Sequence, residues 1–199
     1  MLSGLLLKKS LLSLLLISVC LSSAVLCIAD STASSPDVIK LLPKNNEIKG
    51  WKIVPKTLVY GSGKTLTNIY DGGFELYTKN GVLDAAQQTY KGASVEDFTT
   101  ITIHRMTSKE SAKKFLDYWR IPDSKQPSFK PLKTGWNGYV YLANGAANGY
   151  LQQDRYFVTI SMYPDGEKGR AAAVSFLENI AAAISKLTAP PIPPAKDRR

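Results

Sequence analysis

The stretch FTTITIHRMTSKESAKKFLDYW (residues 98–119) decides the fold, because a well-marked strand and a well-marked helix follow each other directly. Alternation of side chains over residues 98–106 predicts a strand. Thr107 and Glu110 then stand at the spacing of a capping box, which marks the start of a helix. Its apolar face consists of Ala112, Phe115, Leu116 and Trp119. We therefore predict a strand that leads into a helix ending before Pro122.

Two further segments have helical periodicity. The first starts near Leu66 and stops at Gly81, and its apolar positions are Leu66, Ile69, Tyr70, Gly73, Phe74 and Tyr77. Gly73 lies on this stripe, which predicts a close approach to another backbone. The second runs from about residue 169 to 187, and its apolar face consists of Ala173, Leu177, Ile180, Ile184 and Leu187.

The remaining ordered segments have the character of strands and turns. Residues 138–142 and 156–163 alternate as strands do, and Asn144-Gly145 and Asn148-Gly149 are hairpin turn signals. Hairpins imply an antiparallel sheet. We predict an α+β fold in which a sheet of hairpins packs against about three helices, with an α/β/α sandwich as the specific form considered.

The N-terminus has the organisation of a secretory signal. Lys8 and Lys9 precede an uncharged run from residue 11 to 28, and Asp30 ends it. Cleavage after Ala29 is favoured over cleavage after Ala24. We predict a signal peptide at 1–29, a linker at 30–37, a single α+β domain at 38–187 and a disordered, Pro-rich basic tail at 188–199. The alternative is an uncleaved anchor, because the run is close to the length that spans a bilayer.

Composition limits the chemistry of the mature chain. Both cysteines, Cys20 and Cys27, lie in the leader, which excludes disulfides, thiolate nucleophiles and cysteine metal sites from the domain. The full chain has a net charge of +9, and loss of Lys8 and Lys9 leaves +7. This charge favours an anionic envelope polymer or another envelope protein as partner. We expect no nucleic acid partner, because the lysines are scattered, and no stable membrane span after cleavage.

A glycine-rich segment resembles a phosphate-binding loop only in part. Gly61-Ser62-Gly63-Lys64-Thr65 lies between a strand-like run and a helical pattern. The complete motif requires a glycine five residues before Gly63, where this chain has Leu58. We interpret the segment as a turn rich in glycine, serine and lysine. We expect no nucleotide or other cofactor.

Candidate site residues come from three small groups. His104 is the single histidine, so multi-histidine metal sites are excluded, and it is interpreted either as a cleft residue or as a hydrogen-bonded structural residue. Arg105 beside it adds a cation. Asp71 and Glu75 lie four residues apart. We interpret them as an acid/base pair, as oxygen ligands for a hard cation, or as part of a solvated helix face. We expect no metal.

The third group is aromatic. Tyr139 and Tyr141 alternate on a predicted strand, close to Trp136 and the basic Lys133. Such residues can stack on sugar rings and hold anionic groups, although alternating tyrosines also pack sheets. Tyr139 and Tyr141 join Asp71, Glu75, His104 and Arg105 as candidate binding residues.

The spacing of several motifs resembles an uncharacterised family of exported bacterial proteins. The motifs are Leu41-Leu42-Pro43, Gly50-Trp51, Tyr60, Ile69-Tyr70-Asp71-Gly72-Gly73 with Glu75-Leu76-Tyr77, and residues 103–106 before Ser108 and Ala112. The resemblance covers roughly residues 41–118. It implies a bacterial envelope or secreted setting and a tyrosine-rich helix with a double glycine, and it brings no established catalytic residues.

These observations favour a periplasmic or extracellular, non-enzymatic binding or accessory module. One alternative is a hydrolase that acts on an envelope glycan or ester through Asp71 with Glu75 or His104. That hypothesis requires the side chains to converge on one cleft. The other alternative is a membrane-tethered structural protein that keeps its leader.

Overall fold

The computed structural model describes residues 36–94, 96–119, 130–133, 136–163 and 166–189. The predicted signal peptide, and all but the last two residues of the predicted linker, lie outside the described residues. The predicted tail also lies outside them, apart from its first two residues.

One antiparallel sheet organises the described part of the chain. Its strands are β1 (Lys52–Ile53), β2 (Val59–Ser62), β3 (Val82–Lys91), β4 (Phe98–Met106), β5 (Lys130–Pro131), β6 (Asn137–Ala143), β7 (Ala146–Gln153) and β8 (Tyr156–Tyr163). They lie in the order β1-β3-β4-β8-β7-β6-β5, and β2 also pairs with β3. The predicted α+β class with an antiparallel sheet is confirmed.

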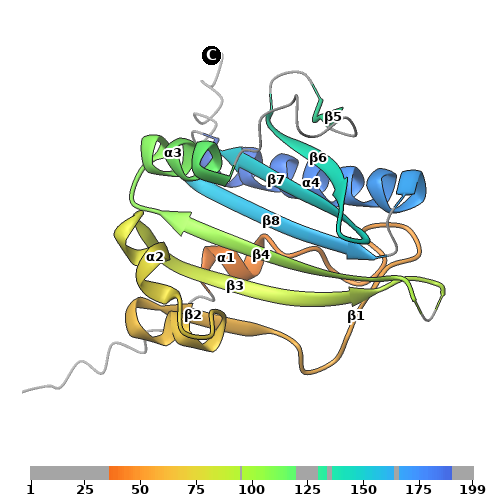
Figure 1. Cartoon of the computed structure of the whole chain (residues 1–199), viewed down its shortest axis with the longest axis horizontal. Coiled ribbons are helices and arrows are strands. Elements are labelled where there is room, and N and C mark those ends of the chain that lie inside the picture. Colours follow the sequence, from red (N-terminus) through yellow and green to blue (C-terminus); the bar gives the residue numbers. More distant parts are fainter. Residues whose placement is uncertain (1–35, 95, 120–129, 134–135, 164–165, 190–199) are drawn as a thin grey trace, which may run out of the picture. The chain divides into compact units, whose positions relative to one another are not determined.

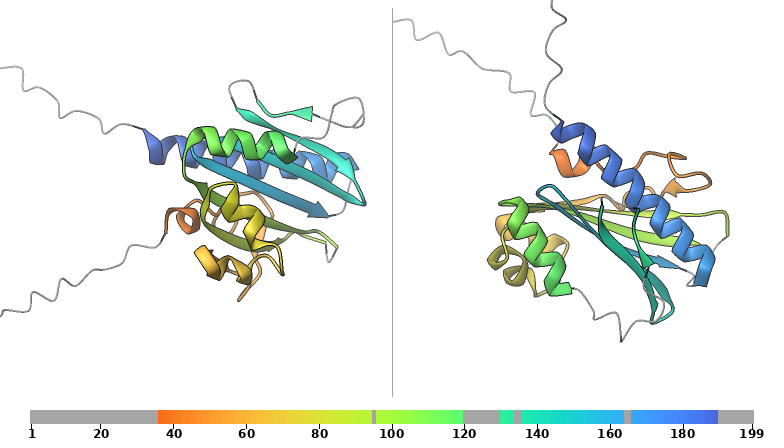
Figure 2. Two further views of the ribbon diagram at one scale, coloured as in Figure 1. Left: turned by 60° about the vertical axis from the view of Figure 1, so that its left-hand side comes forward. Right: turned by 90° about the horizontal axis from the view of Figure 1, so that it is seen from above.

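Helices cover both faces of this sheet. α1 (Asp37–Lys40) and α4 (Gly166–Thr188) pack on one face, here called the α4 face. The 3-10 helix η1 (Gly63–Asn68), α2 (Phe74–Lys79) and α3 (Lys109–Trp119) pack on the opposite, α3 face. Figures 1 and 2 show α3 and α4 on opposite sides of the strands, so the arrangement has three layers. In the part of the chain that the structure describes, no helix has both the length and the apolarity to cross a bilayer.

Alternation along the central strands separates two cores. On β4, Ile101 and Ile103 belong to the core under α4, and Met106 belongs to the core under α3. This follows from the two-residue period of a strand, which sends neighbouring side chains to opposite faces. The α4 contribution to its core is Ala173, Phe176, Leu177, Ile180, Ala181 and Ile184.

The two predicted Asn-Gly turns have different outcomes. Asn144 and Gly145 have φ values of 54° and 73° and connect β6 to β7, as a two-residue hairpin turn requires. Asn148-Gly149 lies inside β7, so the prediction of a turn there is wrong. A Cβ on Gly149 would lie 2.7 Å from Leu177 Cδ1. The glycine therefore serves the close approach of α4 to the sheet.

The helix predicted to start near Leu66 is interrupted. η1 ends at Asn68, Gly72 takes a φ of +70°, and α2 begins only at Phe74. A Cβ on Gly73 would meet no atom within 4 Å, so the predicted close approach at Gly73 is wrong. The two short helices both face the sheet, so their apolar residues keep a helical spacing. Periodicity alone cannot distinguish this arrangement from one continuous helix.

The glycine-rich segment was interpreted as a turn, but it forms the junction of two elements: Gly61 and Ser62 end β2, and Gly63 begins η1. A Cβ on Gly61 would lie 2.4 Å from the Thr65 carbonyl oxygen, so η1 folds back closely over β2. The Ser62 N–H donates to Thr65 Oγ1 at 2.8 Å, and that hydroxyl donates to the Ser62 carbonyl oxygen. Glycine at position 61 is thus explained by packing.

The helix predicted after residue 107 is present as α3, with its cap one residue later than expected. The Ser111 N–H donates to Ser108 Oγ at 3.1 Å. Thr107 Oγ1 contacts the Ser111 hydroxyl at 2.9 Å instead of a backbone N–H. The capping residue is therefore Ser108, which fits a helix that begins at Lys109.

Candidate functional site

An open pocket on the α3 face brings together aromatic rings and hydroxyl groups. It has a volume of about 170 Å³. The lining residues come from the η1–α2 connection, α2, β4, α3, β7 and β8, and they are Tyr70, Tyr77, His104, Trp119, Tyr150, Thr159 and Ser161. None of these described lining residues carries a carboxylate, an ammonium or a guanidinium group. We call this site the aromatic pocket.

His104 is a buried, neutral member of the aromatic pocket. Its Nδ1–H donates to the Phe157 carbonyl oxygen at 2.8 Å, and Nε2 accepts from the Tyr70 hydroxyl. Burial lowers the pKa of the imidazole to about 4, so His104 is uncharged at neutral pH. With a pKa of about 4 the imidazole is a weak base, and its Nε2 lone pair already accepts from Tyr70, so His104 is poorly suited to deprotonate a ligand or water.

Parallel rings form the walls of the pocket. Tyr70 and Tyr77 stack with centroids 3.5 Å apart and planes 12° apart. The His104 ring lies nearly parallel to both, and Trp119 lies parallel to Tyr150 with centroids 6.4 Å apart. Burial raises the pKa of the Tyr70, Tyr77 and Tyr150 phenols, which keeps them protonated. The walls therefore present neutral ring faces and hydroxyl groups.

Trp119 adds an indole N–H group to the aromatic pocket. Its Nε1 is buried and has no acceptor among the described residues. An unsatisfied buried donor costs about 1–3 kcal/mol, so a nearby acceptor on a ligand would be favourable. Trp119 also lines the aromatic pocket, and its carbonyl oxygen accepts from the Tyr139 hydroxyl at 3.1 Å. That backbone contact ties the end of α3 to β6.

A row of uncharged polar side chains continues from the pocket across the α3 face. The row, here called the hydroxyl lane, consists of Gln87, Thr89, Thr100, Thr102, Asn148, Thr159 and Ser161. Its members are interconnected: Gln87 Nε2 donates to Thr102 Oγ1 at 3.0 Å, and Ser161 Oγ donates to Asn148 Oδ1 at 3.1 Å. A fifth of the residues in this chain are charged, which makes an uncharged row of seven notable.

A second aromatic group stands at the far end of the hydroxyl lane. Phe98 and Tyr163 are cross-strand partners whose rings stack with centroids 4.7 Å apart, and Phe98 is 44% exposed. In Figure 1 the helices α2 and α3 of the α3 face lie towards the arrowhead end of β4, away from Phe98, where β4 begins. The lane thus runs from the aromatic pocket to an exposed aromatic pair.

The structure separates the carboxylates from the histidine. Asp71, in the turn before α2, and Glu75, in the first turn of α2, are both exposed, whereas His104 is buried. Neither carboxylate lines the aromatic pocket. The convergence that the hydrolase hypothesis requires is not found at this pocket. Among the described residues, no three His, Cys, Asp or Glu side chains are grouped as a metal site would require.

Arg105 belongs to a structural ion pair on the opposite face from His104. Its Nη2 lies 2.7 Å from Asp84 Oδ2 and its Nε donates to Oδ1 at 3.0 Å. Asp84 is 2% exposed at its side chain, and the Tyr60 hydroxyl also donates to it, at 3.2 Å. Hydrogen bonding to Asp84 raises the pKa of the guanidinium. Arg105 is therefore engaged within the fold.

Tyr139 and Tyr141 are buried in the core under α3, next to the aromatic pocket. The residues that sequence reasoning missed are Tyr70, Tyr77, Trp119, Tyr150, Thr159 and Ser161. The available signal was the repetition of hydroxyl side chains at alternate positions of residues 98–106 and 156–163. Only strand pairing shows that the two sets share one face.

Comparison with known proteins gives no match: no family model and no curated protein sequence corresponds to this chain. The resemblance to exported bacterial proteins therefore remains an expectation.

Proposed function

We propose that the protein is an exported, non-enzymatic binding module that holds a neutral, hydroxyl-rich chain, of the saccharide type, on its α3 face. The observation that carries this proposal is the aromatic pocket, which has no charged lining residue and continues into the hydroxyl lane. Saccharides combine apolar ring faces with hydroxyl edges. Tyrosine and tryptophan rings match the former, and threonine, serine, asparagine and glutamine side chains match the latter.

Protonation states support a neutral ligand. The lowered pKa of His104 and the raised pKa values of the pocket tyrosines keep every titratable lining group uncharged at neutral pH. A charged ligand would lose its hydration without gaining a counter-charge in this pocket. Because the chain has a net positive charge, an anionic envelope polymer would contact surfaces outside the aromatic pocket and the hydroxyl lane.

The dimensions support an extended ligand. Ligand pockets typically enclose about 300–1,000 Å³, so a pocket of about 170 Å³ suits a single ring. Along β4, Phe98 lies six residues from His104, so the hydroxyl lane extends roughly 20 Å beyond the pocket at about 3.4 Å per residue. One sugar ring in the pocket and further rings along the lane would reach the Phe98–Tyr163 pair.

Two features support binding without catalysis. Both nitrogens of His104 are engaged, and the exposed Asp71 and Glu75 do not line the pocket. The proposal of export is supported by the charged, apolar and small-residue order of residues 1–29. Export would place the α3 face among envelope glycans.

Isothermal titration with neutral glucose and N-acetylglucosamine oligomers of increasing length tests this proposal. Affinity is expected to rise with chain length, because longer chains reach the Phe98–Tyr163 pair. Phe98→Ala should weaken binding of long oligomers and leave the monosaccharide unaffected. Leu58→Ala is the control, because Leu58 is an exposed apolar residue that lies outside the pocket and the hydroxyl lane. Equal binding by all variants, or no binding by any neutral oligomer, would refute the proposal.

A further inference from the structure

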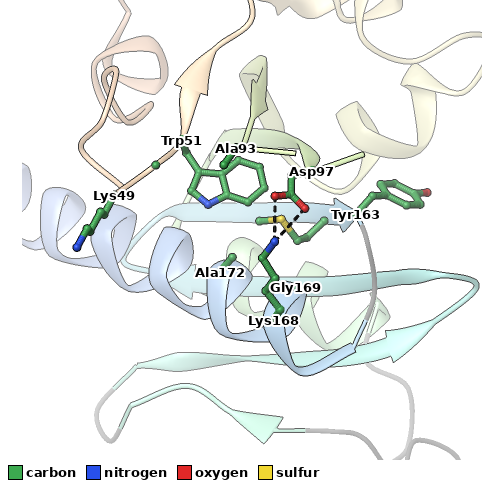
Figure 3. Close-up of a pocket in the computed structure, with 11 residues that line it drawn as sticks. Lys49, Trp51, Ala93, Asp97, Tyr163, Lys168, Gly169 and Ala172 are labelled. Carbon is green, nitrogen blue, oxygen red and sulfur yellow. Dashed lines mark hydrogen bonds and ion pairs between the residues drawn. The ribbon is translucent and has the colours of Figure 1, made fainter. Parts of the chain in front are cut away.

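A second hollow lies at the start of α4 and has a different chemistry. It has a volume of about 150 Å³ and is formed by the segment before β1, the β3–β4 connection, the end of β8 and the first turns of α4. Figure 3 shows Trp51, Ala93, Asp97 and Lys168 around it. Met162 also lines it, whereas the ring of the neighbouring Tyr163 is directed away in that view. We call this site the Asp97 hollow.

Asp97 places a nearly buried carboxylate in this hollow. Its side chain is only 6% exposed. The Ser94 N–H donates to Oδ2 at 3.2 Å, and the Gly92 N–H donates to the Asp97 carbonyl oxygen at 2.7 Å. A Cβ on Gly92 would lie 2.7 Å from Asp97 Cβ, so glycine allows this position. The β3–β4 connection therefore holds the carboxylate in place.

Lys168 supplies the counter-charge from the solvent side. Its Nζ lies 3.1 Å from Asp97 Oδ2 and 3.3 Å from Oδ1, and its hydrogen bond lowers the pKa of that carboxyl group. The lysine side chain is 76% exposed, in contrast to its partner. An ion pair with one exposed, flexible member contributes little to stability. The ammonium group can thus leave while the carboxylate stays fixed.

Trp51 and Met162 complete an environment suited to a cation with an apolar part. The Trp51 indole packs edge-on against Phe176 with centroids 5.4 Å apart, which fixes its ring. In Figure 3 the indole and the Asp97 carboxylate lie next to each other at the hollow. Lys49, the other cation that lines the hollow, has its ammonium directed away from Asp97 in the same view. A carboxylate beside an aromatic ring is the chemistry that recognises organic ammonium ions.

We propose that the Asp97 hollow binds a small primary amine with a short apolar or aromatic group, whose ammonium replaces Lys168 on Asp97. In the protein without ligand, the Lys168 ammonium takes the place of the ligand ammonium beside Asp97. The apolar group of the ligand lies against Trp51, Met162 and Ala172. This site is independent of the aromatic pocket, because it lies at another part of the sheet and selects a cation.

Titration with phenethylamine and with its uncharged counterpart, 2-phenylethanol, tests this inference in variants of the full mature chain. Lys168→Met keeps an apolar stem and removes the competing cation, so it should bind phenethylamine about three- to five-fold more tightly than the unmodified protein. Lys113→Met, which removes the lysine of an exposed lysine–aspartate pair on α3 outside the hollow, is the matched control and should leave the affinity unchanged. Asp97→Asn should reduce the affinity at least ten-fold.

The amine and alcohol pair keeps the test decisive if Asp97→Asn does not fold. Lys168→Met should bind phenethylamine and not 2-phenylethanol. Equal binding of the two compounds by Lys168→Met would overturn the proposal, because the carboxylate would then make no contribution. Absence of amine binding by Lys168→Met would overturn it as well.

Discussion

The two faces of the sheet are built from the same strands but differ in the chemistry of their side chains. On β4 and β8, the α4 face presents Ile101, Ile103, Val158 and Ile160, all at most 2% exposed. The alternate positions on the α3 face present Thr100, Thr102, Thr159 and Ser161. Apolar side chains on these strands are buried under α4 and stabilise the first face, whereas the hydroxyl groups on the second are the surface that we propose for ligand binding. Under this proposal, these two strands contribute to stability through one face and to recognition through the other.

The largest expected difference between the faces is in stability. Phe176→Ala removes a fully buried ring from the α4 face and should lower the free energy of unfolding by about 3–5 kcal/mol. Thr159→Ala in the hydroxyl lane should change it by about 0.5 kcal/mol or less, because Thr159 is only part-buried. Urea unfolding measures both. Comparable losses in the two variants would contradict the division of roles.

The Asp84–Arg105 pair should show the next largest effect. Arg105→Met leaves the buried Asp84 carboxylate with only the Tyr60 hydroxyl from its present side-chain partners, and should cost about 2–3 kcal/mol. This value is reduced from that of a fully buried pair because the Arg105 side chain is 31% exposed. The double variant Asp84→Leu with Arg105→Met should recover part of the loss. A double variant less stable than the single one would show that the pair itself contributes the stability.

A smaller effect should appear as a dependence of stability on pH. Burial lowers the pKa of His104 from 6.5 to about 4, so the unfolded state binds a proton at a pH where the folded state does not. The stabilisation is complete above pH 6.5 and is lost as the pH falls towards 4, by up to about 1.4 kcal/mol per pH unit. Urea unfolding between pH 7 and 5 measures it. His104→Phe should flatten the profile, and an unchanged slope in that variant would assign the effect to other groups.

The smallest expected effect is on ligand binding, after the removal of one hydroxyl group from the hydroxyl lane. Thr159→Val keeps the shape of the side chain and removes the hydroxyl group, so it should weaken oligosaccharide binding by about 0.5–1.5 kcal/mol. Leu58→Ala, at an exposed site outside the lane, is the control. Identical affinities for the two variants would place the ligand elsewhere.

Local signals predicted the elements well where one face is apolar and the ends are marked. Residues 98–106 and 156–163 form strands with the predicted bounds, and α3 and α4 lie where periodicity placed them. The strand β3 was missed, because Ala85, Ala86, Gln87 and Gln88 do not alternate clearly between apolar and polar. Its burial comes from helices on both faces, which a local pattern does not contain.

The candidate site was predictable only in part. His104 was singled out as the one histidine of the chain, and it lies on a strand with the predicted bounds. Tyr70, Trp119 and Tyr150 come from the η1–α2 connection, α3 and β7, and they meet because the first two segments pack on the face that the paired strands β4, β8 and β7 form. Asp71 and Glu75 attracted attention through their spacing, yet that spacing describes an exposed turn and helix start. Long-range register, and not residue type, determines which side chains meet.

Mapping of amide and indole N–H resonances by NMR during titration with a neutral oligosaccharide tests the central claim most directly. The account predicts shifts at the hydroxyl lane and at the Trp119 indole N–H, one of three indole signals, which Trp119→Phe would assign. Residues of α4 and the Asp97 hollow should remain unchanged. Shifts confined to the α4 face, or none at saturating ligand, would contradict it.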